Sequence, residues 1–231
     1  MIRPELSDLC METNWEGSPD MTSAPLLNDP YNLIITGVGG QGNVLASRMV
    51  GDMLSRLGFQ VTIGEIFGAS QRGGSVMSHL RISGEWTLSP QIPKRMAHAV
   101  VALEPTEAIR VLRDYGNPRV KVLCNMRPVH AVGVICGEKR YPELEQLRKW
   151  IEALSETAWF IDATDKALEL GSPIFANIIS VGALAATGVL PLDRAIFESV
   201  LSLKMTPDKV AVNLAAFDAG VAMVKAQGKG R

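Results

Sequence analysis

The chain has 231 residues, of which 47 % are hydrophobic, and its formal net charge at pH 7 is −1. This length and composition suit one large domain or two small ones with a sizeable core. No apolar run reaches the roughly 18 residues of a membrane span. The near-neutral charge is far from a nucleic-acid footprint, so we expect neither a membrane nor a nucleic acid as a partner.

Cysteine usage indicates the compartment. Cys10, Cys124 and Cys136 are far apart and odd in number, which argues against a disulfide framework. None belongs to a C-x-x-C pair that would hold zinc or an iron–sulfur cluster. No basic stretch followed by an apolar one marks a secretory signal. We therefore expect a cytoplasmic protein and assign no metal site to the chain.

Residues 1–30 differ from the rest of the chain in charge. They hold one basic and six acidic residues, a net of −5, which leaves 22 basic and 18 acidic residues, a net of +4, for the remainder. They show no hydrophobic periodicity and are interrupted by prolines. We predict a mobile N-terminal arm over 1–30 and a single domain over 31–231.

Short apolar segments alternate with helical patterns from Tyr31 onward. The predicted strands cover residues 31–36, 59–65, 76–82, 98–103, 120–124 and 158–162. The predicted helices cover residues 42–57, 105–114, 142–154 and most of the chain after 162. This alternation predicts an α/β fold, a three-layer α/β/α Rossmann-like domain whose sheet is mostly parallel.

Two segments have less regular patterns. The alternation over 76–82 is followed by Ser83 and Gly84 and then by 85–88, which predicts an antiparallel hairpin between the two segments. Residues 129–135 read as an uncertain further strand.

Two late helices have unusual composition. Residues 174–186 are apolar nearly all round, which predicts a helix buried in the core or under a partner subunit. The last helix has an apolar stripe and several small residues that permit close packing. Asn177 and Asn213 are amides in these apolar helices, and buried amides need partners. They either hydrogen-bond within the core or face a ligand or a subunit.

A glycine-rich turn joins the first predicted strand to the first predicted helix. Its glycines fit G-x-G-x-x-G through Gly37, Gly39 and Gly42. A strand that ends in glycines and turns into a helix presents bare backbone N–H groups at a helix N-terminus, which is an arrangement that binds anions. The spacing alone is a weak signal.

A second glycine-rich segment follows the predicted strand 59–65. It carries Arg72 between Gln71 and two glycines, and a guanidinium beside unshielded amides can hold a phosphate or carboxylate. Because ligands bind at the carboxyl edge of such sheets, we predict that both loops form one cofactor-binding edge. Its predicted residues are Gly37, Gly39, Gly40, Gln41, Gly42, Ser70, Gln71, Arg72, Gly73 and Gly74. The alternative is that the glycines only allow the turn and that Arg72 is solvated.

No catalytic residue is assigned. Glu65 lies roughly where a nicotinamide dehydrogenase would place its ribose-binding acid, 28 positions after Gly37, yet no catalytic pair follows it. His79, His98 and His130 are expected to be structural.

The glycine-rich segments also carry a family pattern. Gly-Val-Gly-Gly-Gln-Gly at 37–42, Gln-Arg-Gly-Gly-Ser-Val at 71–76 and Ser-His-Leu-Arg-Ile at 78–82 resemble the gamma-type domain of 2-oxoacid:ferredoxin oxidoreductases. Later segments agree, among them Tyr-Pro at 141–142 and Leu-Pro-Leu at 190–192. The resemblance covers about 31–231 and is strongest to the beta subunit of the indolepyruvate type.

That resemblance implies an accessory subunit, inactive alone, of an enzyme that oxidatively decarboxylates a 2-oxo acid to an acyl-coenzyme A. Thiamine diphosphate, magnesium and iron–sulfur clusters would be in a large alpha subunit, which passes electrons to ferredoxin, and coenzyme A would reach a shared cleft. Two other readings stay open: a stand-alone dinucleotide-binding dehydrogenase and a nucleotide-sensing module.

Overall fold

The computed structural model describes residues 26–68, 73–130, 132–138 and 140–228. Within them the strands form one sheet with the order β2-β3-β1-β4-β5-β6. The strands are β1 (Tyr31–Val38), β2 (Gln60–Phe67), β3 (Ser75–Ser83), β4 (Ala99–Ala102), β5 (Lys121–Asn125) and β6 (Thr157–Ile161). All run in one direction except β3, which is antiparallel to both of its neighbours.

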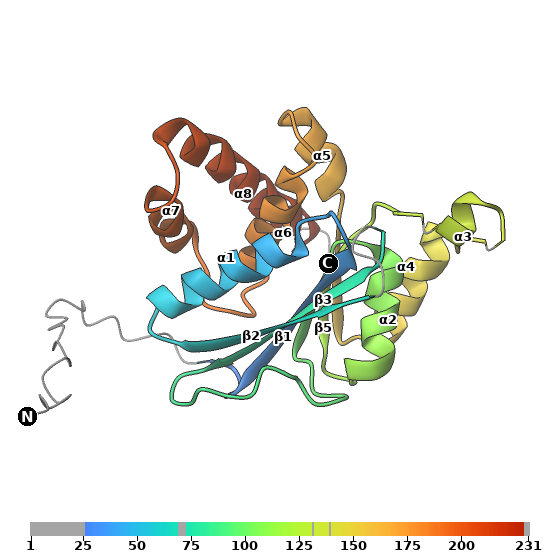
Figure 1. Cartoon of the computed structure of the whole chain (residues 1–231), viewed down its shortest axis with the longest axis horizontal. Coiled ribbons are helices and arrows are strands. Elements are labelled where there is room, and N and C mark those ends of the chain that lie inside the picture. Colours follow the sequence, from blue (N-terminus) through green and yellow to red (C-terminus); the bar gives the residue numbers. More distant parts are fainter. Residues whose placement is uncertain (1–25, 69–72, 131, 139, 229–231) are drawn as a thin grey trace, which may run out of the picture.

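Helices cover both faces of the sheet. They are α1 (Asn43–Arg56), α2 (Pro105–Tyr115), α3 (Val132–Ile135), α4 (Leu144–Ala153), α5 (Ala163–Glu169), α6 (Phe175–Ala186), α7 (Arg194–Ser202) and α8 (Pro207–Gly228). Figure 1 shows α1, α6, α7 and α8 on one side of the sheet and α2 and α4 on the other. The predicted three-layer α/β/α architecture is therefore confirmed. No helix in the described ranges has the length and apolarity to cross a membrane.

The two layers follow from the alternation of side chains along the strands. Leu33 and Ile35 of β1 pack into the core under α1, α6 and α8, whereas Ile34 between them packs into the core under α2. Strand β5 does the same, with Leu123 on the first side and Val122 on the second. Strands buried on both faces are nearly continuous hydrophobic runs, which is why they are recognisable in the sequence.

The expected hairpin forms with a different partner. Strand β3 pairs with β2 before it, from Gln60 opposite Ser83 to Phe67 opposite Val76, and residues 85–88 are not a strand. The other edge of β3 is occupied by β1, with Tyr31 opposite Ile82. Because both edges of β3 are filled over its length, nothing is left for 85–88 to pair with.

Residues 129–135 are the second correction. The predicted uncertain strand is not formed, since 132–135 make the short helix α3. This segment lacks the period of two that a half-buried strand requires.

The buried C-terminal helix pair is confirmed. A Cβ on Gly182 of α6 would lie 2.0 Å from the Phe217 carbonyl oxygen of α8, and one on Gly220 would lie 1.9 Å from the Ile179 carbonyl oxygen. The backbones of the two helices therefore touch where both side chains are absent, and the stacked rings of Phe197 and Phe217 pack beside this contact at 4.5 Å between centroids.

The folded body begins slightly before the predicted boundary at residue 31. Leu26 packs against the main core, and the Asp29 carboxylate accepts a hydrogen bond from the Gly84 N–H at 2.9 Å. The remaining part of the predicted arm, residues 1–25, lies outside the described residues.

Candidate functional site

The two glycine-rich segments lie side by side at the carboxyl edge of β1. The Gly39 N–H donates to the Gly74 carbonyl at 2.7 Å, and the Gly73 N–H donates to the Gly39 carbonyl at 3.4 Å. The two loops converge as expected, although β1 and β2 are not neighbours in the sheet. The antiparallel strand β3 lies between them. Three of the predicted site residues, Ser70, Gln71 and Arg72, lie outside the described residues.

Helix α1 begins at this edge with free backbone donors. Gly42 is its N-cap and has no side chain to cap the helix, and the first turn contains no acidic residue. Gly42 has a φ of 85° and Gly40 a φ of 105°, a region that glycine enters without strain. The uncapped N–H groups and the helix dipole therefore favour an anion at this point.

A cavity of about 730 Å³ opens in front of this helix end. It is lined by Gly39, Gly40, Gly42, Asn43, Val44, Phe67, Gly68 and Val76. The Phe67 side chain is 55 % exposed, and its neighbour Ile66 is also exposed. The site is thus an open cleft with backbone donors on one side and the exposed Phe67 side chain on the other.

Gln41 holds the loop from inside. Its Oε1 accepts from the Val38 N–H at 2.7 Å, and its Nε2 donates to the Leu103 carbonyl at 2.9 Å. These bonds join the ends of β1 and β4. The Gln41 side chain is thus engaged with the protein backbone, and its predicted cofactor contact would have to come from its main chain.

Two buried amides lie beneath the loop without full hydrogen bonding. Asn177 on α6 is 0 % exposed, and neither its Nδ2 nor its Oδ1 has a partner among the described residues. Asn43 donates to the Val38 carbonyl at 3.2 Å, but its Oδ1 is also unpartnered. Among the described residues Asn177 therefore makes no hydrogen bond within the core, so the first of the two expectations for it is not met. Asn213 bonds within its own helix, to the Lys209 carbonyl.

A carboxylate network supports the second loop. The Ser75 hydroxyl donates to Glu107 Oε2 at 2.5 Å, and Arg110 pairs with the same carboxyl at 3.2 Å. Burial raises the pKa of Glu107, while the Ser75 hydrogen bond and the Arg110 charge act in the opposite direction. Glu104 caps α2 by accepting from the Glu107 N–H at 2.9 Å. The start of β3 is thereby anchored to α2.

A second cavity of about 350 Å³ lies beside the first at the same edge. Gly40 and Gln41 line it together with Asn125, Arg127 and Thr164, which sequence reasoning missed. Asn125 ends β5 and donates to the Leu103 carbonyl and to Thr164 Oγ1. The sequence pattern could have indicated these three residues, because polar residues that follow an apolar strand lie at the carboxyl edge of a parallel sheet.

The geometry does not favour a dinucleotide site. Glu65 lies in β2, separated from β1 by β3, and faces Arg48 at 3.7 Å. It therefore does not end the strand beside the glycine loop, as a ribose-binding acid would. His79 and His98 accept hydrogen bonds from the backbone N–H groups of Ile92 and Asn32, the structural role expected of them.

Known proteins are similar to this chain in sequence and in fold. Residues 32–223 match the family described as pyruvate ferredoxin/flavodoxin oxidoreductase. The indolepyruvate oxidoreductase subunit IorB of Pyrococcus horikoshii is 36 % identical over 196 residues, covering 84 % of this chain and 96 % of the relative. That of Thermococcus kodakarensis is 35 % identical over the same length and coverage.

Solved structures agree in fold. The pyruvate oxidoreductase subunit PORC of Thermotoga maritima has a TM-score of 0.62 at 20 % identity, covering 84 % of this chain and 96 % of that one. The 2-oxoglutarate:ferredoxin oxidoreductase of Magnetococcus marinus, with 2-oxoglutarate, coenzyme A and succinyl-CoA bound, has a TM-score of 0.65 at 21 % identity over 85 % of this chain and 31 % of that one. The resemblance is confirmed: the chain belongs to the pyruvate ferredoxin/flavodoxin oxidoreductase family.

Proposed function

We propose that the chain is the accessory subunit of a thiamine-dependent 2-oxoacid:ferredoxin oxidoreductase of the indolepyruvate type. The observation that carries this proposal is the open cleft where the two glycine loops meet at the start of α1. The relatives of this chain that are named as indolepyruvate oxidoreductase subunits match it over 96 % of their own length. In this proposal residues 31–231 form the gamma-type domain, and the N-terminal arm precedes it, with Leu26 and Asp29 already held against the folded body.

The cleft supplies binding groups for an anion. The N–H groups at the start of α1 have no capping side chain. These groups fit a phosphate of coenzyme A, whose charge the helix dipole would stabilise. A complex of a related enzyme with coenzyme A supports this choice of ligand. Arg72, in the second loop, would be a further anion contact.

The redox cofactors would reside in a large partner subunit. A four-cysteine cluster cannot be built from the three cysteines of this sequence, and Cys124 is buried in the core, where burial raises the pKa of its thiol. Within the described residues no group of three His, Cys, Asp or Glu side chains is placed to hold a metal ion. Bound in the partner, thiamine diphosphate would activate the 2-oxo acid and the clusters would carry electrons to ferredoxin.

The exposed apolar side chains at the rim of the cleft fit contact with that partner. Phe67 is exposed in the lining of the first cavity, and Ile174 is exposed in the lining of the second. A patch of this kind beside a polar cleft is typical of a protein–protein contact. In the proposed complex the partner closes the cleft over the bound 2-oxo acid and coenzyme A, which explains why the chain would be inactive alone.

Co-purification tests the proposal. The tagged chain is expressed with its neighbouring reading frames, and the retained proteins are assayed for 2-oxo acid-dependent reduction of ferredoxin with indolepyruvate, pyruvate and 2-oxoglutarate. We expect retention of a large cluster-bearing subunit and activity highest with the arylpyruvate. Recovery of the chain without such a subunit would overturn the assignment, and preference for another 2-oxo acid would overturn only the indolepyruvate type.

A further inference from the structure

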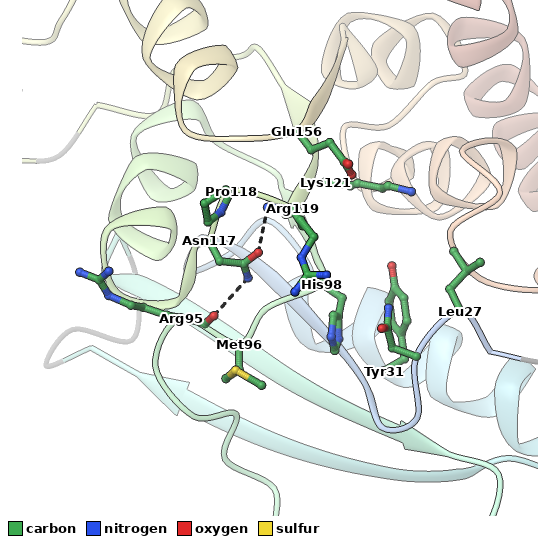
Figure 2. Close-up of a pocket in the computed structure, with 11 residues that line it drawn as sticks. Leu27, Tyr31, Arg95, Met96, His98, Asn117, Pro118, Arg119, Lys121 and Glu156 are labelled. Carbon is green, nitrogen blue, oxygen red and sulfur yellow. Dashed lines mark hydrogen bonds between the residues drawn. The ribbon is translucent and has the colours of Figure 1, made fainter.

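A separate cavity lies at the opposite edge of the sheet. It measures about 300 Å³ and is lined by residues at the amino ends of the parallel strands. Tyr31 begins β1 and Lys121 begins β5, while His98 directly precedes β4. Since β1 is eight residues long, this edge is about 25 Å from the glycine loops. Figure 2 shows this cavity.

The cavity has more cationic than anionic groups. Arg119 and Lys121 line it, and Glu156 is the single acidic residue in its lining. Neither cation forms an ion pair within 4.0 Å in the part of the chain that the structure describes. Figure 2 shows the Arg119 side chain pointing toward His98. The guanidinium and the ammonium are therefore free to bind an anion.

Two aromatic side chains add neutral donors. The Nδ1 atom of His98 accepts from the Asn32 N–H at 2.9 Å, so in the neutral ring Nε2 carries the proton and donates. Burial, and secondarily the Arg119 charge, lower the pKa of His98 and favour this neutral form. The Tyr31 side chain is 2 % exposed, and its ring lies 5.1 Å from that of His98. Burial raises the pKa of Tyr31, which therefore keeps its O–H.

The wall that carries Arg119 is held in place by one amide. Asn117 Nδ2 donates to the carbonyls of Arg95 at 3.1 Å and Ala97 at 2.7 Å, and its Oδ1 accepts from the Arg119 N–H at 3.0 Å. Arg95 has a φ of 61°, a conformation that costs a non-glycine residue about 1 kcal/mol or more. The Arg95 guanidinium points away from the cavity in Figure 2, so this residue contributes its backbone.

We propose that this cavity is a second binding site, for a small molecule that carries a phosphate or a carboxylate. Its donors are the Arg119 guanidinium, the Lys121 ammonium, His98 Nε2 and the Tyr31 hydroxyl, and a volume near 300 Å³ is at the small end of ligand sites. Arg119 can bind either anion with two parallel hydrogen bonds. The site does not depend on the function proposed for the cleft, because the two lie at opposite edges.

Titration calorimetry on the full chain tests the site. Inorganic pyrophosphate and citrate serve as probes, so that the phosphate and the carboxylate are compared. We expect saturable binding of at least one probe and a loss of roughly tenfold or more in the Arg119→Gln/Lys121→Gln double variant, because this variant removes both charged hydrogen-bond donors. The matched control is Lys94→Gln/Lys149→Gln, two cations outside this lining, for which we expect less than about a twofold change.

Two further variants test whether the probe binds in this cavity or elsewhere on the chain. Phe67→Ser alters the cleft at the opposite edge without a large cost in stability and should leave the probe affinity unchanged. A chain lacking residues 1–25 should bind the probe as the full chain does. The proposal is overturned if neither probe saturates, if the control variant weakens binding as much as the double variant, or if Phe67→Ser abolishes binding. It is also overturned if binding appears only in the shortened chain, since the acidic segment would then be the native occupant.

Discussion

Gly42 and Asn177 meet at the start of α1, although they are far apart in the sequence. A Cβ atom on Gly42 would lie 2.2 Å from Asn177 Nδ2, and the Asn177 amide is buried without a partner among the described residues. The contact fixes the glycine loop against α6. It also means that a larger residue at this position would force the Asn177 side chain to move.

Gly42→Ala should therefore destabilise the fold and distort the glycine loop that lines the cleft. The substitution combines a φ of 85° with the clash against Asn177, and we expect a loss of about 2–4 kcal/mol in the free energy of unfolding, measured by urea denaturation. Gly188→Ala is the control, because its φ is 69° but no atom lies within 4 Å of the added Cβ. Equal losses in the two variants would show that the contact with Asn177 contributes nothing.

Ser75→Ala should release the start of β3 from α2. Removing the hydroxyl takes a hydrogen-bond donor from the buried Glu107 carboxyl. We therefore expect a loss of about 1–3 kcal/mol in the free energy of unfolding and a further rise in the pKa of Glu107. Carbon NMR of the carboxyl measures this pKa. The control is Ser202→Ala, an exposed serine whose hydroxyl bonds within its own helix. An unchanged Glu107 titration would contradict the assigned hydrogen bond.

His79 should make stability fall at acidic pH. Burial lowers the pKa of His79 from 6.5 to about 4, and its side chain is 1 % exposed. The unfolded chain therefore takes up this proton near pH 6.5 and the folded chain only near pH 4. The resulting stabilisation is fully present above pH 6.5 and is lost as the pH falls toward 4.

The His79→Gln variant isolates this effect. Between pH 7 and pH 4 the wild type should lose up to about 3 kcal/mol more unfolding free energy than the variant, because one pKa unit corresponds to about 1.4 kcal/mol. The exposed His130→Gln is the control and should follow the wild type. Parallel curves for the wild type and His79→Gln would mean that His79 titrates alike in both states.

Phe67→Ser should weaken assembly without weakening the fold. Phe67 is exposed at the rim of the cleft, so its removal should cost little stability but reduce retention of the large subunit roughly tenfold, measured by quantitative pull-down. Trp86→Ser removes an aromatic side chain that is at least as exposed, beyond the far end of β3, and should leave retention unchanged. Loss of retention in both variants would point to a general loss of apolar surface.

Most helices and buried strands could be predicted because their signals are local. Pro105 begins α2 where a first-turn proline is expected, and the apolar run over 98–103 becomes β4 within one residue at each end. The partners of β3 could not be predicted in this way. Its alternation fits pairing with the segment before or after it, and only tertiary contacts with β1 decide between them.

The candidate site was predictable in place but not in detail. The glycines indicated the carboxyl edge because they mark a strand that turns into a helix. The approach of Asn177 to Gly42 depends on how α6 crosses α1, for which a single sequence contains no local signal. The hydrogen bonds of the Gln41 side chain to the protein backbone could not be predicted either. A glutamine in a glycine loop is compatible with either a ligand or the backbone as its partner.

The contact between α6 and α8 has a consequence for protein engineering. Gly182 and Gly220 allow two backbones to touch, so each glycine is required only while the other helix keeps its position. A chimera that takes α8 from a relative should fold only when that helix has a glycine at the position of Gly220. Residues 175–228 thus form one exchangeable module, and a useful crossover point lies before α6 rather than between α6 and α8.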